Sequence, residues 1–173
     1  MRWFLVVLAT LAIACTPTQG PAPPQRPPTP LELVERSADL DGRIVGPSDA
    51  SATIVVSFAS WCVHCRDHLA VIDAVRAAHP RVRILGVNYK AHEEYASRGS
   101  SDAVRAYVRE SAPWLRVVPI DGDVFRALGA PPKVPTIFVF DRAGVLVETY
   151  DRRARALPDA AELDALLRRI RGS

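Results

Sequence analysis

The sequence has little cysteine and contains no second cysteine pair. Three cysteines occur among 173 residues, namely Cys15, Cys62 and Cys65. A structural zinc site usually takes four ligands, and a disulfide-stapled extracellular domain needs several bonds. This shortage disfavours both classes, although His64 and His68 leave an improvised metal site open as an alternative.

The chain also lacks an apolar run long enough to cross a membrane comfortably. The segment from Trp3 to Ala14 is almost wholly apolar, but as a helix it would span only about 18 Å, against roughly 30 Å of hydrocarbon core. No stretch interleaves aromatic and basic residues, and the net charge is only +3. We therefore expect no nucleic-acid partner.

The N-terminal segment instead has the features of an export signal. Met1 and Arg2 place a positive charge before the apolar run, as in a signal peptide. The run ends in Ala14-Cys15, which resembles a bacterial lipoprotein signal, although Ala12 stands where leucine is usual. Lipidation of Cys15 would leave the other two cysteines as one pair, whereas simple secretory cleavage would leave a third reactive thiol. We predict a signal peptide over 1–14 and a lipid anchor on Cys15.

A proline-rich segment follows. Seven of the fifteen residues 16–30 are proline, so this stretch should extend as polyproline II over up to roughly 46 Å. We interpret 15–30 as a semi-rigid, lipid-anchored tether and 31–173 as the folded domain.

Within that domain, strand and helix patterns alternate, which indicates an α/β fold with helices on the faces of a central sheet. We expect 90–101 to be a polar loop and see no internal repeat. The predicted helices are 31–37, 62–78, 101–111, 123–128 and 159–171, and the predicted strands are 51–58, 82–88, 115–120, 136–140 and 145–150.

The two remaining cysteines lie where a buried strand leads into a helix. Ile54 to Phe58 is apolar and rich in β-formers, and helical spacing begins after Cys65. The free N–H groups and dipole of a helix N-terminus favour a thiolate at Cys62. A disulfide closing so short a loop adds little stability. The pattern therefore favours redox chemistry over a structural bond.

Five segments of the chain resemble the thioredoxin-like superfamily. The nearest group is the membrane-tethered, extracytoplasmic TlpA/ResA-like oxidoreductases, many of which serve cytochrome c maturation. The resemblance implies a thioredoxin-like fold, with a central mixed β-sheet flanked by helices and an inserted αβ unit. The matching segments are 57–65 (S-F-A-S-W-C-V-H-C), 84–88 (I-L-G-V-N), 119–121 (P-I-D), 134–141 (V-P-T-I-F-V-F-D) and 143–144 (A-G).

The resemblance also implies roles for individual residues. Cys62 would be the nucleophile and Cys65 the resolving cysteine, while Trp61 covers one side of the thiols. Val134 and Pro135 would form a substrate-docking groove, with the proline in a cis peptide bond facing the pair. No cofactor is implied.

The chain departs from the family pattern at three positions. Val56 stands where cytosolic thioredoxins carry a buried aspartate. His68 replaces a glutamate common in reducing members, and we interpret it as a helix-surface histidine rather than a substitute base. His64 in the spacer resembles disulfide-forming oxidases and isomerases, and we expect it to tune the reduction potential. We interpret His79 and His92 as surface residues.

These observations predict a lipid-anchored thiol-disulfide oxidoreductase of the bacterial cell envelope. Its partners would be protein thiols or disulfides and, if it acts as a reductant, a membrane electron donor; the direction of electron transfer is left open. The alternative is an envelope copper chaperone using Cys62, Cys65 and a histidine, although such chaperones usually space their cysteines C-x-x-x-C. A peroxidase is disfavoured because 54–62 lacks the P-x-x-x-T-x-x-C arrangement.

Overall fold

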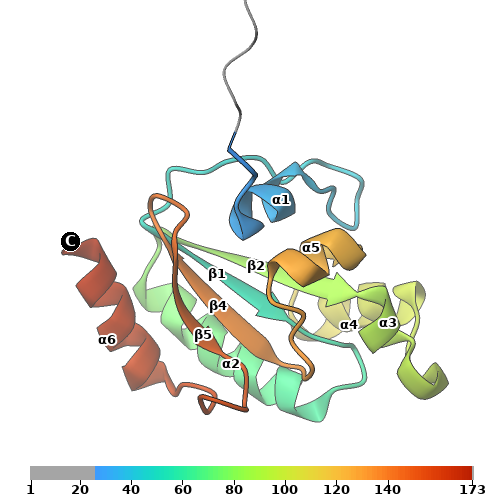
Figure 1. The fold of residues 1–173 in the computed structure, drawn as a ribbon. Helices are drawn as coiled ribbons and strands as arrows, with labels where there is room; N and C mark the ends of the chain where they lie inside the picture. The colour runs from blue at the N-terminus through green and yellow to red at the C-terminus, as the bar shows by residue number, and fades with distance from the viewer. Residues whose placement is uncertain (1–25, 173) are drawn as a thin grey trace, which may run out of the picture.

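A five-stranded mixed sheet forms the centre of the molecule (Figure 1). The computed structural model describes residues 26–172, so the predicted signal peptide, Cys15 and most of the tether lie outside the described residues. The strand order is β3-β2-β1-β4-β5, with β1 to β3 parallel and β4 antiparallel to both of its neighbours. The strands are β1 (Ala52–Ser57), β2 (Val82–Tyr89), β3 (Arg116–Ile120), β4 (Thr136–Asp141) and β5 (Leu146–Tyr150).

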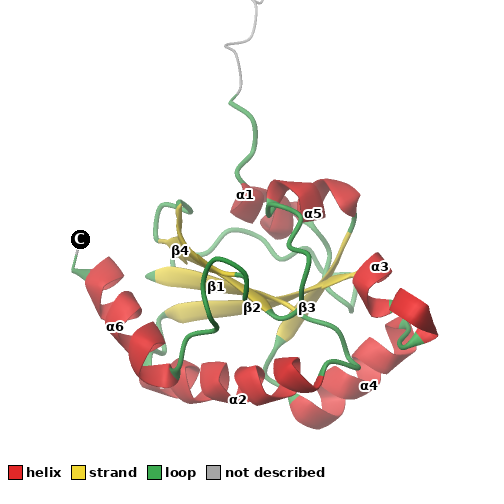
Figure 2. Cartoon of the chain, turned by 60° about the horizontal axis from the view of Figure 1, so that its bottom comes forward, coloured by secondary structure: helices red, strands yellow, loops and turns green. Residues whose placement is uncertain are grey.

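Helices cover both faces of this sheet, as Figure 2 shows. Helices α2, α4 and α6 pack on one face, while α1 and α5 pack on the other. The helices are α1 (Pro30–Arg36), α2 (Val63–Ala78), α3 (Lys90–Glu93), α4 (Ser101–Ser111), α5 (Gly122–Ala127) and α6 (Ala160–Arg171), with a 3-10 turn η1 (Tyr95–Ser97) after α3. None of the described helices is long and apolar enough to cross a membrane.

Strand β1 is buried throughout, and mostly apolar, because both faces of the sheet are covered. Ile54 and Val56 belong to the core under α2 and α6, whereas Val55 belongs to the core under α1 and α5. All six residues of β1 are buried. A central strand of this kind reads as a continuous hydrophobic run rather than an alternating one.

The pairing of β1 with β4 positions the functional end of the sheet. Ser57, the last residue of β1, pairs with Thr136, the first residue of β4. The chain therefore leaves β1 toward Cys62 at the same edge where it enters β4 from Pro135. This register places two segments side by side that are more than seventy residues apart.

The predicted inserted αβ unit is present as α4 and β3, between β2 and α5. The expectation of a polar loop over 90–101 was wrong, because α3 and η1 occupy much of that segment. Glu93 is only 2% exposed there. The segment folds back onto the end of β1 because buried donors hold its carboxylate, as described below.

The start of the domain is also defined by local capping. Thr29 is the N-cap of α1, and its hydroxyl accepts the backbone N–H of Glu32, whose carboxylate in turn accepts the N–H of Thr29. Pro30 occupies the first helical position, where its missing N–H costs nothing. Thr29 and Pro30, at the end of the predicted tether, thus belong to the beginning of α1.

Candidate functional site: a cysteine pair beside a groove

Cys62 and Cys65 lie at the N-terminus of α2. Their Cα atoms are 5.2 Å apart and their sulfur atoms are joined in a disulfide. Cys62 is the N-cap residue of the helix, and its Sγ accepts the backbone N–H of Cys65 at 3.2 Å. Cys62 is 7% exposed and Cys65 is fully buried. Only the first sulfur can therefore meet a partner, and the helix terminus stabilises negative charge on it.

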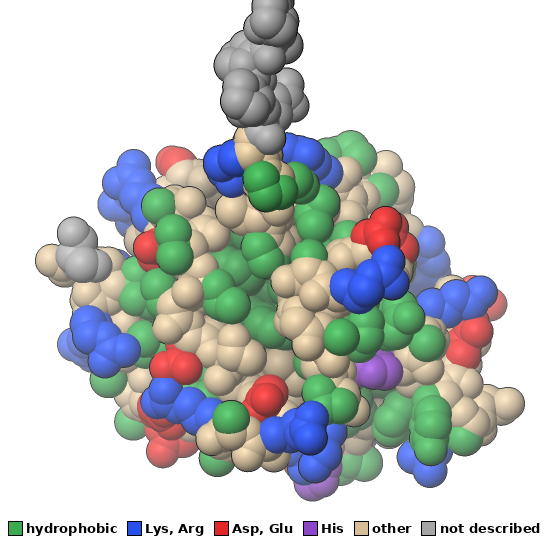
Figure 3. All heavy atoms as spheres, in the orientation of Figure 1, with side chains coloured by type: hydrophobic (Ala, Val, Ile, Leu, Met, Phe, Trp, Pro, Cys, Tyr) green, Lys and Arg blue, Asp and Glu red, His purple; other side chains and the backbone are tan. Residues whose placement is uncertain are grey.

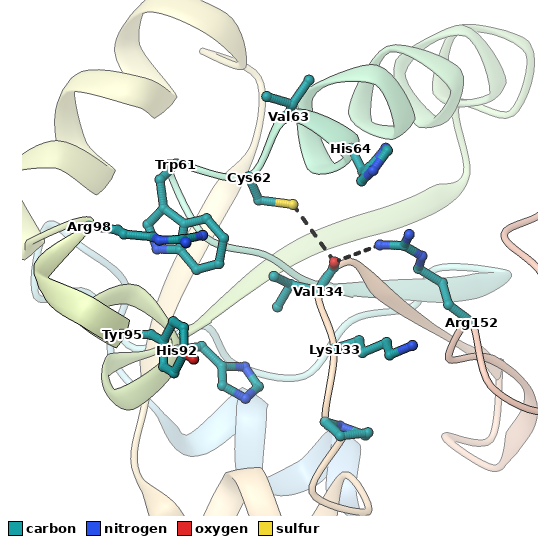
Figure 4. Close-up of a pocket in the computed structure, with 11 residues that line it drawn as sticks. Trp61, Cys62, Val63, His64, His92, Tyr95, Arg98, Lys133, Val134 and Arg152 are labelled. Atoms are coloured by element: carbon teal, nitrogen blue, oxygen red, sulfur yellow. Dashed lines mark hydrogen bonds between the residues drawn. The ribbon is translucent and has the colours of Figure 1, made fainter.

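Val134 approaches Cys62 from the other segment. The Val134–Pro135 peptide bond is cis, as the resemblance implied. The carbonyl oxygen of Val134 lies 3.7 Å from Cys62 Sγ, as Figure 4 shows. Pro135 itself is buried, so the backbone of Val134 is the part of this segment that faces the sulfur.

A groove of about 530 Å³ opens beside Cys62. It runs between the turn before α2, the α3–η1 segment and the loop before β4 (Figure 4). Its lining residues are Trp61, Cys62, Val63, His64, His92, Tyr95, Arg98, Pro132, Lys133, Val134 and Arg152. The predicted site residues Trp61, His64 and Val134 thus lie together around Cys62, and Pro135 follows Val134 as a buried residue outside the lining.

Trp61 forms one wall of the groove next to Cys62 (Figure 4). Its indole Nε1 donates a hydrogen bond to the backbone carbonyl of Glu93 at 2.8 Å. The guanidinium of Arg98 lies over the indole ring, 5.2 Å from its centroid. These two contacts fix the ring plane at the side of the sulfur.

Glu93 is a site residue that sequence reasoning missed. Its Oε2 accepts the backbone N–H of Ser60 at 2.9 Å and the side-chain amide of Asn88 at 2.9 Å, and its Oε1 accepts the hydroxyl of Ser60. The buried carboxylate therefore ties the turn before Cys62 to the end of β2. No local pattern distinguishes Glu93 from the exposed Glu94 beside it, so only the tertiary contacts reveal this role.

His68 is buried, so its interpretation as a surface histidine was wrong. It lies on α2 one turn after Cys65, is 9% exposed, and its Nε2 has no hydrogen-bond partner among the described residues. Burial lowers its pKa below the ordinary value because the charged imidazolium loses hydration. Val56, on β1, is buried in the same core cluster as Cys65.

Two further histidines are also more buried than expected. His79 is 3% exposed and its Nε2 lies 2.7 Å from the Asp164 carboxylate, which joins the end of α2 to α6. His92 is half-buried against the rings of Tyr89 and Phe125 at 5.4 and 5.1 Å. Desolvation lowers the pKa of His92. The expectation that both were surface residues was wrong, because Asp164 and Phe125, which lie far along the chain from these histidines, pack against them.

His64 is exposed at the rim of the groove and takes part in no hydrogen bond between described residues. Over residues 26–172, no group of three or more His, Cys, Asp and Glu side chains is arranged to hold a metal ion.

Comparisons with known proteins agree with this geometry. No protein-family model matches the chain, and no curated protein matches it. Among solved structures, a secreted disulfide oxidoreductase of Mycobacterium tuberculosis, described as homologous to E. coli DsbE, is 18% identical with a TM-score of 0.60 over 77% of this chain and 93% of that one.

Two further structures are equally remote in sequence. A thiol:disulfide interchange protein of the thioredoxin family from Chlorobium tepidum is 20% identical, with a TM-score of 0.63 over 86% of this chain and 100% of that one. StoA from Bacillus subtilis is 20% identical, with a TM-score of 0.57 over 75% and 92%. The predicted fold is therefore confirmed: this chain has the thioredoxin-like fold, with a cysteine pair at the start of α2.

Proposed function

We propose that the protein is a thiol-disulfide oxidoreductase that exchanges disulfides with protein substrates in the bacterial cell envelope. The observation that carries the proposal is the environment of Cys62. Its sulfur accepts a backbone N–H at a helix N-terminus and faces an open groove, while Cys65 is sealed behind it. Solved structures with this fold include proteins described as disulfide oxidoreductases.

The exchange needs only the two sulfurs and a partner. In the reduced protein, the Cys62 thiolate attacks one sulfur of a substrate disulfide, and the bond between the substrate sulfurs breaks. The released substrate thiolate takes up a proton. Cys65 then loses its proton to solvent, and its thiolate attacks Cys62 Sγ in the mixed disulfide. The bond between Cys62 and the substrate breaks, the second substrate sulfur leaves as a thiolate that takes up a proton, and the Cys62–Cys65 disulfide remains. The same steps in reverse oxidise a substrate dithiol.

The buried position of Cys65 makes the second step intramolecular. Since Cys65 is fully buried, no external thiol or disulfide reaches it directly, whereas Cys62 lies within one helical turn. Val134 offers its backbone to an extended substrate segment beside Cys62, in the manner of strand addition. Cys62 therefore attacks the substrate, and Cys65 releases the substrate from Cys62.

Cysteine variants test this assignment in the full chain carrying Cys15→Ser, which removes the third thiol. Reduced protein should catalyse the reduction of insulin disulfides. Cys62→Ser should abolish activity, and Cys65→Ser should accumulate mixed disulfides detectable by mass spectrometry, because attack proceeds without resolution. Full activity of Cys62→Ser would reject the function.

We also propose that the mature protein is lipid-anchored through Cys15 and carries its domain outside the cytoplasm on the 15–30 tether. The support is the short apolar segment ending in Ala-Ile-Ala-Cys and the proline content that follows. From the resemblance to TlpA/ResA-like proteins, we extend this proposal to a membrane protein as electron donor and to a role in cytochrome c maturation. Mass spectrometry of the mature N-terminus should find an acylated Cys15, and an unmodified soluble product would contradict the anchor.

A further inference from the structure

The groove beside Cys62 carries uncompensated positive charge. Arg98, Lys133 and Arg152 line it, and none of its lining residues within 26–172 is Asp or Glu. Among the described residues, neither the Arg98 guanidinium nor the Lys133 ammonium has an ion pair or a hydrogen bond. The Arg98 guanidinium lies over the rings of Trp61 and Tyr95.

Of the seventeen described arginines outside the groove, nine form an ion pair with an acid. Arg83 pairs with Glu35, and Arg116 pairs with Asp39 at 2.7 Å. On the face drawn in Figure 3, basic groups lie beside acidic ones at several places. In the groove, none of the three described cations has an ion pair, and all three line the same cavity as Cys62.

Arg152 occupies the backbone group that a substrate would use. Its Nη1 donates a hydrogen bond to the Val134 carbonyl at 3.2 Å, the same oxygen that lies 3.7 Å from Cys62 Sγ (Figure 4). The acid next to it in sequence, Asp151, is turned away, because its carboxylate accepts the backbone N–H groups of Arg153 and Ala154. A segment that pairs with the Val134 carbonyl therefore competes with this guanidinium for the same oxygen.

The chemistry of the incoming segment decides how costly this competition is. A neutral or basic segment takes the carbonyl and leaves Arg152 without a partner. An acidic side chain gives the guanidinium a carboxylate instead, and such charge-assisted bonds are about twice as strong as neutral ones. Arg98 on the other side of Cys62, together with Lys133, adds attraction for the same sign of charge (Figure 4).

Building on the oxidoreductase function above, we propose that the preferred substrates are extended polypeptide segments whose reactive cysteine is flanked by Asp or Glu. Binding would exchange the Arg152–Val134 hydrogen bond for an Arg152–carboxylate pair and free the Val134 carbonyl for the substrate backbone. Val63 and Tyr95 are 67% and 63% exposed in the lining, which gives a polypeptide apolar surface to cover that a small anion would not use.

The test uses peptides that differ only in charge. Three peptides of equal length would carry the same two-cysteine disulfide, flanked by aspartate, asparagine or lysine. The full chain with Cys15→Ser is reduced and mixed with each one, and acid quenching followed by chromatography yields second-order rate constants. The aspartate peptide should react about tenfold faster than the lysine peptide at low salt, and this ratio should shrink as salt screens the charges.

Protein variants then distinguish an effect of the groove on these rates from an effect of the protein's overall charge. Arg152→Ala should raise the rate for the asparagine peptide, because the Val134 carbonyl is already free, and should lower the aspartate-to-lysine ratio to under about threefold. Lys133→Glu should lower the aspartate-to-lysine rate ratio below that of Arg152→Ala, because it places a negative charge in the groove. The control Arg142→Glu makes the same change of charge on an exposed residue beyond the far end of β4, roughly 17 Å or more from Pro135, and should leave the ratio unchanged.

Other outcomes separate this proposal from the one on which it rests. Equal rates for all three peptides, or a ratio unaffected by Arg152→Ala, would overturn the charge preference while leaving disulfide exchange intact. Oxidised glutathione reacting faster than the aspartate peptide would overturn the polypeptide occupant in favour of a small anionic disulfide. Reaction with none of these probes, and none with insulin, would overturn the function itself.

Discussion

Replacing Glu93 by alanine should destabilise the domain far more than its place in a polar segment suggests. The substitution removes the acceptor of three donors, namely the backbone N–H and the hydroxyl of Ser60 and one N–H of the buried Asn88 amide. An orphaned buried donor costs about 1–3 kcal/mol, with the low end for the half-buried Ser60. Together with the lost packing around a side chain that is 2% exposed, we expect a loss of about 3 kcal/mol.

Urea unfolding of the oxidised chain measures this loss. With an m-value of about 2 kcal/mol per molar urea, the midpoint should fall by about 1.5 M. Two variants serve as controls. Glu93→Gln keeps an acceptor for Ser60 N–H and Asn88 and should cost about 1 kcal/mol or less. Glu94→Ala removes only an exposed ion pair with Lys90 at 3.7 Å and should cost under about 0.5 kcal/mol.

The same variants test whether Glu93 positions the cysteine turn. Ser60 lies two residues before Cys62, so losing its anchor should slow insulin reduction in Glu93→Ala, while Glu93→Gln should retain most of the rate. The reasoning fails if Glu93→Ala unfolds within about 0.3 M urea of the parent chain. It also fails if Glu93→Gln is as unstable as Glu93→Ala, because the charge rather than the hydrogen bonds would then be the relevant property.

Three other predictions follow from the site. Burial holds the pKa of His68 below its ordinary value of 6.5, so the unfolded chain takes up a proton first as the pH falls. The free energy of unfolding should therefore decrease below about pH 6.5. The difference between the urea midpoints at pH 7 and 5.5 should be smaller in His68→Leu than in the parent chain, and an equal difference would contradict this. His64→Pro should make the reduction potential more negative, on the order of 30 mV in glutathione buffers, because a donor near the Cys62 thiolate is lost, and an unchanged potential would make His64 a bystander. A Cβ at Gly99 would lie 2.0 Å from Glu93 Oε1, so Gly99→Ala should displace the carboxylate and lower the urea midpoint. The control Gly172→Ala also lacks a positive φ, and its Cβ would lie 3.8 Å from the nearest atoms, so it should leave the midpoint nearly unchanged.

The local pattern of the sequence was sufficient for the fold class. The mostly apolar run of β1, the helical spacing after Cys65 and the apolar run of β4 each reflect burial by neighbouring layers, which leaves a recognisable pattern within a short window. The position of Cys62 at a helix N-terminus followed from the same junction of strand and helix. The lipid anchor at Cys15 stays a prediction from its own short motif.

The tertiary structure decided what surrounds the sulfur. Val134 reaches Cys62 because Ser57 pairs with Thr136, and Glu93 is buried because the segment after β2 folds back onto the end of β1. Such contacts depend on strand register and on the path of an insertion. Neither leaves a periodic trace, since a carboxylate that will be buried and one that will stay in water are the same residue type in the sequence. That is why the cysteine pair was visible in the sequence, while its Glu93 anchor and the Arg152 guanidinium over its docking carbonyl were not.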